Sequence, residues 1–108
     1  MKLLTKSIER KLRANAADPD GNHKPVMKLF DPTGSGTWLI SEMDENGMMF
    51  GLADLGMGSP ELGYIYLPEL AEYRGPLGLG IERDTWFKGD KPLSEYADAA
   101  RAAGRITA

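Results

Sequence analysis

Polar and charged side chains that could do chemistry together lie in the stretch 60–87. They are Glu61, Tyr64, Arg74, Glu82, Arg83 and Asp84. If Glu61 and Glu82 converged in the fold, repulsion between the two carboxylates would keep one of them protonated, and that group could serve as a general acid. Arg83 could bind a carboxylate or a phosphate through two parallel hydrogen bonds. This combination would suit a small hydrolase or transferase.

A structural role for the same residues is the competing interpretation. Successive residues of a strand point to opposite faces of a sheet, so Glu82 and Asp84 would point one way and Arg83 the other. This alternation favours an ion-paired network that fixes the segment 77–87 to a sheet, rather than one ligand-binding or catalytic site.

Motifs with an established chemistry are absent from the sequence. It has no cysteine, and its single histidine, His23, cannot supply a two-histidine metal site. The GxSxG and HExxH patterns and the phosphate-binding glycine patterns do not occur. We therefore predict no metal and no cofactor, and the sequence favours a non-catalytic protein over an enzyme.

A second candidate site lies in a predicted N-terminal helix. Its basic residues are Lys6, Arg10, Lys11 and Arg13. They could contact nucleic-acid phosphates, and an exposed Trp38 or Trp86 could stack on an unpaired base. A solvated helix face is the competing interpretation and is favoured, because the acidic remainder of the chain would repel phosphate.

The charge of the chain is divided unevenly along it. Residues 1–28 carry seven bases and three acids, whereas residues 29–72 carry eight acids and no lysine or arginine. Residues 73–108 carry six bases and five acids, and the formal net charge is −3. Either the basic and acidic segments pair with each other across the fold, or the acidic segment presents a face to a basic partner.

The candidate acidic face is formed by Glu42, Asp44 and Glu45. Four methionines surround these residues, namely Met43, Met48, Met49 and Met57. Methionines can form an adaptable binding surface, but they more often fill irregular gaps in a core, and we favour the second role.

Hydrophobic periodicity predicts an α+β fold with a mostly antiparallel sheet of four to five strands. The spacing of Leu4, Ile8 and Leu12 predicts an N-terminal helix over 3–16, with Thr5 as a plausible N-cap. The sheet core spans 26–67, with strands at 26–30, 37–43, 48–53 and 64–67. A short helix over 68–74, an extended segment over 77–87 and a C-terminal helix over 92–103 follow. The extended segment is predicted to be a buried connector or an edge strand.

The most definite local prediction is a hairpin around Asn46 and Gly47. Asn-Gly readily adopts positive φ, which predicts a type I turn with a bulge at Gly47 between the strands 37–43 and 48–53. Trp38 and Ile40 are then expected to meet Phe50 and Leu52 on one face of the pair.

Length and composition fit one domain of 108 residues. The absence of cysteine is compatible with a reducing compartment. The N-terminal residues lack the apolar run of a signal peptide, and no stretch has the roughly 20 apolar residues of a membrane span. We therefore expect a cytoplasmic protein without membrane contact.

Several short motifs together resemble a known family. They are LLTK at 3–6, KLFDP at 28–32, TW at 37–38 with Glu42 and Asp44, FGL at 50–52, PELGY at 60–64, Leu67 with EL at 69–70, RGPLGL at 74–79, IERD at 81–84, Phe87 and PL at 92–93. This pattern resembles the bacterial and plasmid-borne family catalogued as domain of unknown function 2958. Gly80 stands where the family pattern has proline, and the alanine-rich tail after Tyr96 departs from the pattern.

The resemblance implies no particular activity, but it implies a setting. Genes of this family look like cargo of plasmids and other mobile elements, which would suit accessory roles in DNA transactions or against host defence. We favour a non-catalytic interaction module that binds an unknown protein partner through the acidic face. A nucleic-acid-binding accessory protein is the first alternative, and a small enzyme with a Glu/Arg site is the second.

Overall fold

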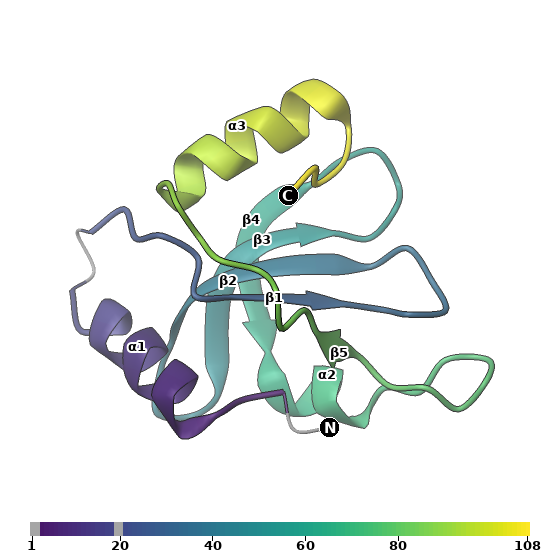
Figure 1. The fold of residues 1–108 in the computed structure, drawn as a ribbon, viewed down its shortest axis with the longest axis horizontal. Helices are drawn as coiled ribbons and strands as arrows, with labels where there is room; N and C mark the ends of the chain where they lie inside the picture. Colours follow the sequence, from purple (N-terminus) through teal and green to yellow (C-terminus); the bar gives the residue numbers. More distant parts are fainter. Residues whose placement is uncertain (1–2, 19–20) are drawn as a thin grey trace.

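The structure is a computed structural model that describes residues 3–18 and 21–108 (Figure 1). Its five strands are β1 (Met27–Phe30), β2 (Thr37–Met43), β3 (Met48–Asp54), β4 (Glu61–Tyr66) and β5 (Glu82–Arg83). Its helices are α1 (Lys6–Ala16), α2 (Leu67–Glu72) and α3 (Leu93–Ala103). All strand pairs are antiparallel, in the order β4-β3-β2-β1-β5. The predicted α+β class is therefore confirmed.

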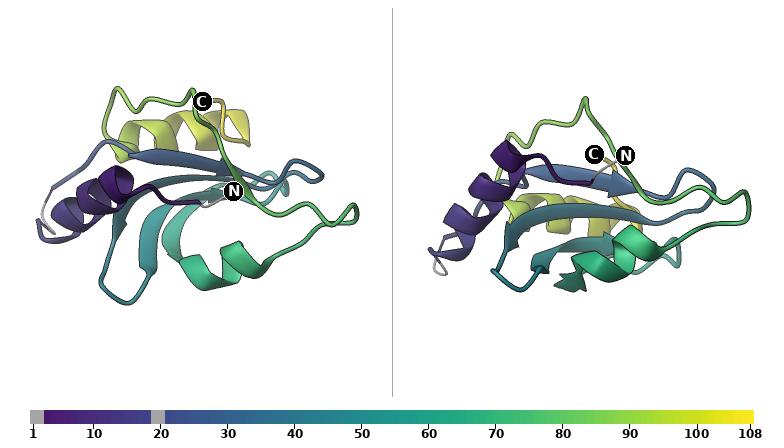
Figure 2. Two further views of the ribbon diagram at one scale, coloured as in Figure 1. Left: turned by 60° about the horizontal axis from the view of Figure 1, so that its bottom comes forward. Right: turned by 90° about the horizontal axis from the view of Figure 1, so that it is seen from below.

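Helices cover both faces of the sheet (Figure 2). On one face, which we call the α1 face, Leu12 of α1 packs with strand residues, and α2 adds Leu67 and Leu70 at the margin. The strand residues of this cluster are Met27, Leu29, Trp38, Ile40, Met43 and Met49. On the opposite α3 face, α3 packs against Leu39 and Leu52. Because Trp38 is buried, it is not available to stack on a base.

Helix α1 begins three residues later than predicted. Thr5 is its N-cap, as expected, and its Oγ1 accepts a hydrogen bond from the Ile8 N–H at 3.1 Å. The segment before it is not helical, because Leu3 is buried in the core and its carbonyl oxygen accepts a hydrogen bond from Arg83. That contact ties the chain's beginning to β5.

The hairpin turn has the predicted form, but its strands face differently. Gly47 has a φ of +87° and its N–H donates to the Asp44 carbonyl. The expectation that Trp38 and Ile40 meet Phe50 and Leu52 is wrong. The register shifts between Ile40 and Glu42, and Ile40 pairs with Gly51 while Trp38 pairs with Ala53. Small residues opposite these bulky ones leave room on the α1 face.

The segment between α2 and β5 also differs from the prediction. Only Glu82–Arg83 is a strand, whereas residues 75–80 form a turn in which Gly78 has a φ of +74°. Leu77 is 77% exposed and Leu79 43%, so the expectation of a buried segment is wrong for both. Ile81, at 6%, is where the segment enters the core. Apolar residues separated by glycines can occur in an exposed loop as well as in a strand.

Helix α3 begins and ends close to the predicted residues. Gly104 caps it in the left-handed conformation with a φ of +75°. Tyr96 is buried between α3 and the preceding loop, where its hydroxyl donates to Asp90 Oδ1 at 2.8 Å and accepts from the Asp90 N–H at 3.2 Å. Both Asp90 contacts hold the loop before α3 against the helix.

Burial of Tyr96 predicts a loss of stability at alkaline pH. Burial raises its pKa above the ordinary value of 10.0, because the charged phenolate is poorly solvated there. The stabilising effect is present below the unfolded pKa and is lost as the pH rises through the higher folded pKa. Tyr96→Phe is expected to weaken this pH dependence and to lower the neutral-pH stability by about 1 kcal/mol. Denaturant unfolding at neutral and alkaline pH checks this, with exposed Tyr64→Phe as the control; equal alkaline losses in all three proteins would contradict it.

Candidate functional site

The structure separates the residues of the candidate acid site. Glu61 begins β4 at one edge of the sheet, and Glu82 begins β5 at the opposite edge, with β3, β2 and β1 between them. Tyr64 lies with Glu61 on β4. The two carboxylates therefore do not converge, and the proposed acid pair has no common pocket. Long-range strand order, which places Glu61 and Glu82, is not evident from their sequence spacing.

The remaining members of that cluster lie near β5 and hold the chain in place. Arg83 Nη1 donates to the Leu3 carbonyl oxygen at 2.8 Å. Asp84 pairs with Lys28 Nζ at 3.7 Å and accepts the Trp86 N–H at 2.9 Å. Arg74 Nη1 donates to the carbonyl oxygens of Ala71 and Tyr73. The contacts of Arg83 and Asp84 join the segment before α1 and the loop after β5 to the sheet, whereas those of Arg74 are local to the end of α2. The contacts of Arg83 and Asp84 fit the structural interpretation.

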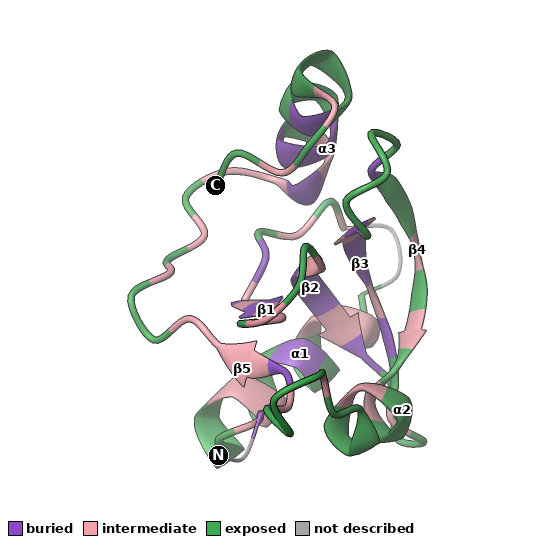
Figure 3. Ribbon diagram, turned by 90° about the vertical axis from the view of Figure 1, so that its right-hand side faces the viewer, coloured by how far each residue is buried: buried purple, intermediate pink, exposed green. Residues whose placement is uncertain are grey.

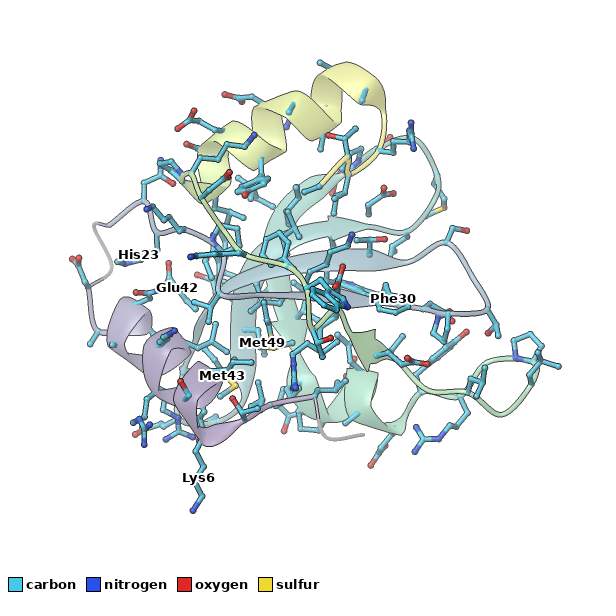
Figure 4. The ribbon with its side chains drawn as sticks, viewed as in Figure 1. Lys6, His23, Phe30, Glu42, Met43 and Met49 are labelled. Atoms are coloured by element: carbon cyan, nitrogen blue, oxygen red, sulfur yellow. The ribbon has the colours of Figure 1, made fainter. Side chains whose placement is uncertain are left out.

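The four basic residues of α1 are all exposed, but they differ in their surroundings. Figure 4 shows Lys6 pointing away from the molecule at one end of α1, with His23 beyond the other end. Arg13 is paired with Glu9 at 2.9 Å. Lys11 lines a hollow that Lys24 also lines, and neither Lys6 nor Arg13 lines it. The four bases named from the sequence therefore divide into separate environments, and Arg10 is exposed on the helix.

The acidic hairpin combines exposed charge with a structural role. Asp44 and Glu45 are exposed, and Glu42 is half-buried opposite Phe50. The Asp44 carboxylate accepts hydrogen bonds from the N–H groups of Asn46 and Met48, at 2.8 and 3.0 Å. Reversing the charge at Asp44 would therefore disturb the turn as well as any binding surface. Glu45 is the better position at which to test charge alone.

The methionines near the hairpin divide between the core and the surface. Met43 and Met49 are buried and point toward the interior of the molecule (Figure 4). Met48 is 38% exposed and Met57 77%. Two of the four therefore fill the core, as favoured from the sequence, while the other two remain available to a partner.

Strand β4 offers an open sheet edge. Among the described residues, β3 is its only neighbouring strand. The Leu67 N–H donates to the Gly47 carbonyl at 2.9 Å, in register with the β3–β4 ladder. Because the backbone groups of an antiparallel ladder alternate in direction, the N–H and C=O groups of Leu62, Tyr64 and Tyr66 point away from β3. A second strand could pair with them.

The same three residues present apolar side chains on the α3 face. Leu62, Tyr64 and Tyr66 pair across β3 with Leu52, Phe50 and Met48. Tyr64 is 76% exposed and its ring contacts that of Phe50 edge to face at 5.2 Å. Figure 3 shows β4 as a largely exposed strand beside the buried strands of the sheet. We call the set Leu62, Tyr64, Tyr66, Phe50 and Met48 the aromatic edge.

The aromatic edge lacks the usual protection of an open strand. Natural sheets often guard their edges with lysine or proline. The sequence ELGYIY of β4 contains neither residue, although Pro60 and Pro68 limit its length at both ends. An unprotected edge with exposed aromatic side chains is typical of a binding surface.

Comparison with known proteins assigns the family. The family model described as protein of unknown function (DUF2958) matches residues 3–107. The chain belongs to this family. The chain matches no curated protein and no solved structure.

In the parts of the chain that the structure describes, no group of three His, Cys, Asp or Glu side chains could hold a metal ion. None of the described helices has the length and apolar character needed to cross a bilayer.

The sequence analysis names some members of the aromatic edge for other reasons, and one of them, Met48, is among the methionines around the hairpin. Tyr64 was named beside Glu61 in a polar cluster, whereas Leu62 and Tyr66 were not named as site residues. The signal was present, since Tyr64 and Tyr66 alternate along a strand bracketed by prolines. The missing information was that β4 is an edge strand whose α3 face is left partly uncovered.

Proposed function

We propose that this DUF2958 protein is an interaction module whose aromatic edge binds an extended segment of a partner protein. The observation that supports this most is the open edge of β4, where outward backbone groups and exposed aromatic side chains belong to the same residues. A partner strand would gain main-chain hydrogen bonds from the edge and side-chain contacts from Tyr64 and Tyr66.

The charge around the edge favours a basic partner. Residues 29–72 supply β2, β3, β4, α2 and the second half of β1, and they contain no lysine or arginine. Exposed acids near β4 include Glu45 in the hairpin turn, Glu61, Glu69 and Glu72. Two copies of this face would bring like charges together, which disfavours self-pairing through β4. A segment that alternates lysine or arginine with apolar residues complements both the charge and the aromatic side chains.

The setting of this function is also a proposal. The absence of cysteine fits a cytoplasmic protein. The family resemblance supports an accessory role in a bacterial mobile element. Basic segments are common in proteins that bind nucleic acids, so a partner of this kind would suit such a setting.

A peptide selection tests the proposal without knowledge of the partner. A random peptide library is displayed and selected against the immobilised protein, and the enriched peptides are sequenced. We expect enrichment of lysine or arginine alternating with β-branched or aromatic residues, and weaker capture as salt rises. Glu45→Lys should reduce capture of these basic peptides, because it reverses an exposed charge without removing the Asp44 turn contacts.

A matched control variant distinguishes binding at the aromatic edge from nonspecific adsorption to exposed apolar residues. Leu77→Asp changes an exposed apolar residue outside the aromatic edge, and Tyr64→Asp changes one within it. Loss of capture with Tyr64→Asp alone supports the proposal. Enrichment of acidic peptides, or equal capture by both variants, would refute it.

A further inference from the structure

A basic hollow lies near the β1–β5 edge of the sheet, whereas β4 forms the opposite edge. It has a volume of about 760 Å³ and lies between α1, the segment before β1 and the segment after β5. Its lining residues include Lys11, Lys24 and Lys88 with His23, Trp86 and Phe87. Among the described residues that line it, none is an aspartate or a glutamate. The hollow therefore collects positive charge in a protein whose formal net charge is −3.

The three lysines of the hollow are exposed, and none of them forms an ion pair with an acidic residue that the structure describes. Basic side chains that lie within 4.0 Å of a described acidic side chain include Arg13, His23, Lys28 and Arg101. Lys11, Lys24 and Lys88 are not among them, and all three are exposed. Like charges held around one hollow repel each other, so binding of a polyanion would relieve that repulsion.

Trp86 is the most exposed large apolar residue of the chain that the structure describes, at 94%. Its backbone is held in place, because its N–H donates to Asp84 Oδ1 at 2.9 Å and Asp84 pairs with Lys28. The Phe87 N–H also donates to the Asp84 carbonyl, at 3.3 Å. The turn thus displays an indole ring to solvent beside the lysines. An indole in this position offers a flat surface on which a base can stack.

We infer that this basic hollow binds single-stranded nucleic acid. The lysines contact the backbone phosphates, and Trp86 stacks on a base. An unpaired base is needed for such stacking, which favours a single strand over a duplex. The site uses Lys11 of α1 but not Lys6 or Arg13, and it does not share residues with the aromatic edge. The protein could therefore bind a nucleic acid near one edge of its sheet and a basic protein segment at the opposite edge.

Titration of a fluorescently labelled oligothymidylate against the full chain tests this inference. Anisotropy at low and moderate salt is recorded together with intrinsic tryptophan fluorescence. We expect binding that weakens with salt and quenches the fluorescence, because Trp86 is exposed while Trp38 is buried. Trp86→Ala is expected to weaken binding roughly 5- to 150-fold, the range for loss of one stacked aromatic side chain. Each of Lys24→Gln and Lys88→Gln should reduce the salt slope by about 0.7.

Matched controls distinguish the hollow from general attraction to phosphate. Lys6→Gln and Arg101→Gln remove exposed charge from residues that do not line the hollow, and both should leave affinity within about twofold, since exposed charges outside the site are largely screened at moderate salt. Absence of binding at low salt would overturn the inference. So would equal weakening by the control and hollow variants, tighter binding of duplex than of single strand, or mononucleotide binding as tight as that of the oligomer. Retention of oligomer binding by Tyr64→Asp separates this site from the aromatic edge.

Discussion

Gly51→Ala is expected to lower the free energy of unfolding by roughly 3 kcal/mol or more, at the upper end of the range for overpacked cores. A Cβ at this position would lie 2.1 Å from the Leu39 carbonyl oxygen, a backbone atom of β2. Relief of that overlap requires β2 and β3 to separate near the register shift at Ser41, in the middle of the sheet. Denaturant unfolding of the variant measures the loss.

Gly63 provides a matched control for this substitution, since it pairs directly with Gly51 across β3 and β4. A Cβ on Gly63 has no atom within 4 Å, and its φ is not in the left-handed region. Gly63→Ala is expected to leave stability unchanged or to raise it by about 0.4–1 kcal/mol, because alanine restricts the unfolded chain. Similar losses for the two variants would contradict the strand spacing and register described above.

Tyr64→Pro is expected to weaken binding of a selected basic peptide at least about tenfold beyond the loss caused by Tyr64→Ala. Both variants remove the aromatic ring, but only proline removes the outward N–H and places a bulky ring at the open edge. Calorimetric titration of both variants with the same peptide measures the difference. The proline variant should remain folded, because the N–H of residue 64 does not pair with β3.

Ile65→Pro is the internal control for the direction of the backbone groups. The N–H of Ile65 points toward β3, so proline there should break the ladder and destabilise the sheet by several kcal/mol. If Tyr64→Pro unfolded the protein and Ile65→Pro did not, the assignment of the outward groups would be wrong. Equal peptide affinity of Tyr64→Ala and Tyr64→Pro would argue against pairing of a partner strand with β4.

Much of the fold could be predicted because it depends on local chemistry. Thr5 caps α1, Gly47 forms the hairpin turn and Gly104 ends α3, and each of these depends on residues within one turn. Helix and strand positions follow from the spacing of apolar residues. The start of α1 depends on a longer-range contact, because Leu3 packs in the core and contacts Arg83, and the helix therefore begins at Lys6.

The candidate site could not be predicted to the same extent, since it depends on the order of strands. The hairpin register shifts at Ser41, and this reverses the expected partners of Trp38 and Ile40. Pairing of β5 with β1 places Glu82 far from Glu61. The basic hollow likewise joins Lys11, Lys24 and Lys88 from segments distant in sequence. Local patterns identified these residues as charged or apolar, but only the long-range pairing determines their neighbours.

Amide hydrogen exchange by NMR, with and without a selected basic peptide, tests the central claim most directly. In the free protein, we predict fast exchange at Leu62, Tyr64 and Tyr66 and slow exchange at Gly63 and Ile65. Saturation with the peptide should then slow exchange at the first three amides. If these amides were already protected in the free protein, or stayed unprotected in the saturated complex, binding of a partner strand along β4 would be contradicted.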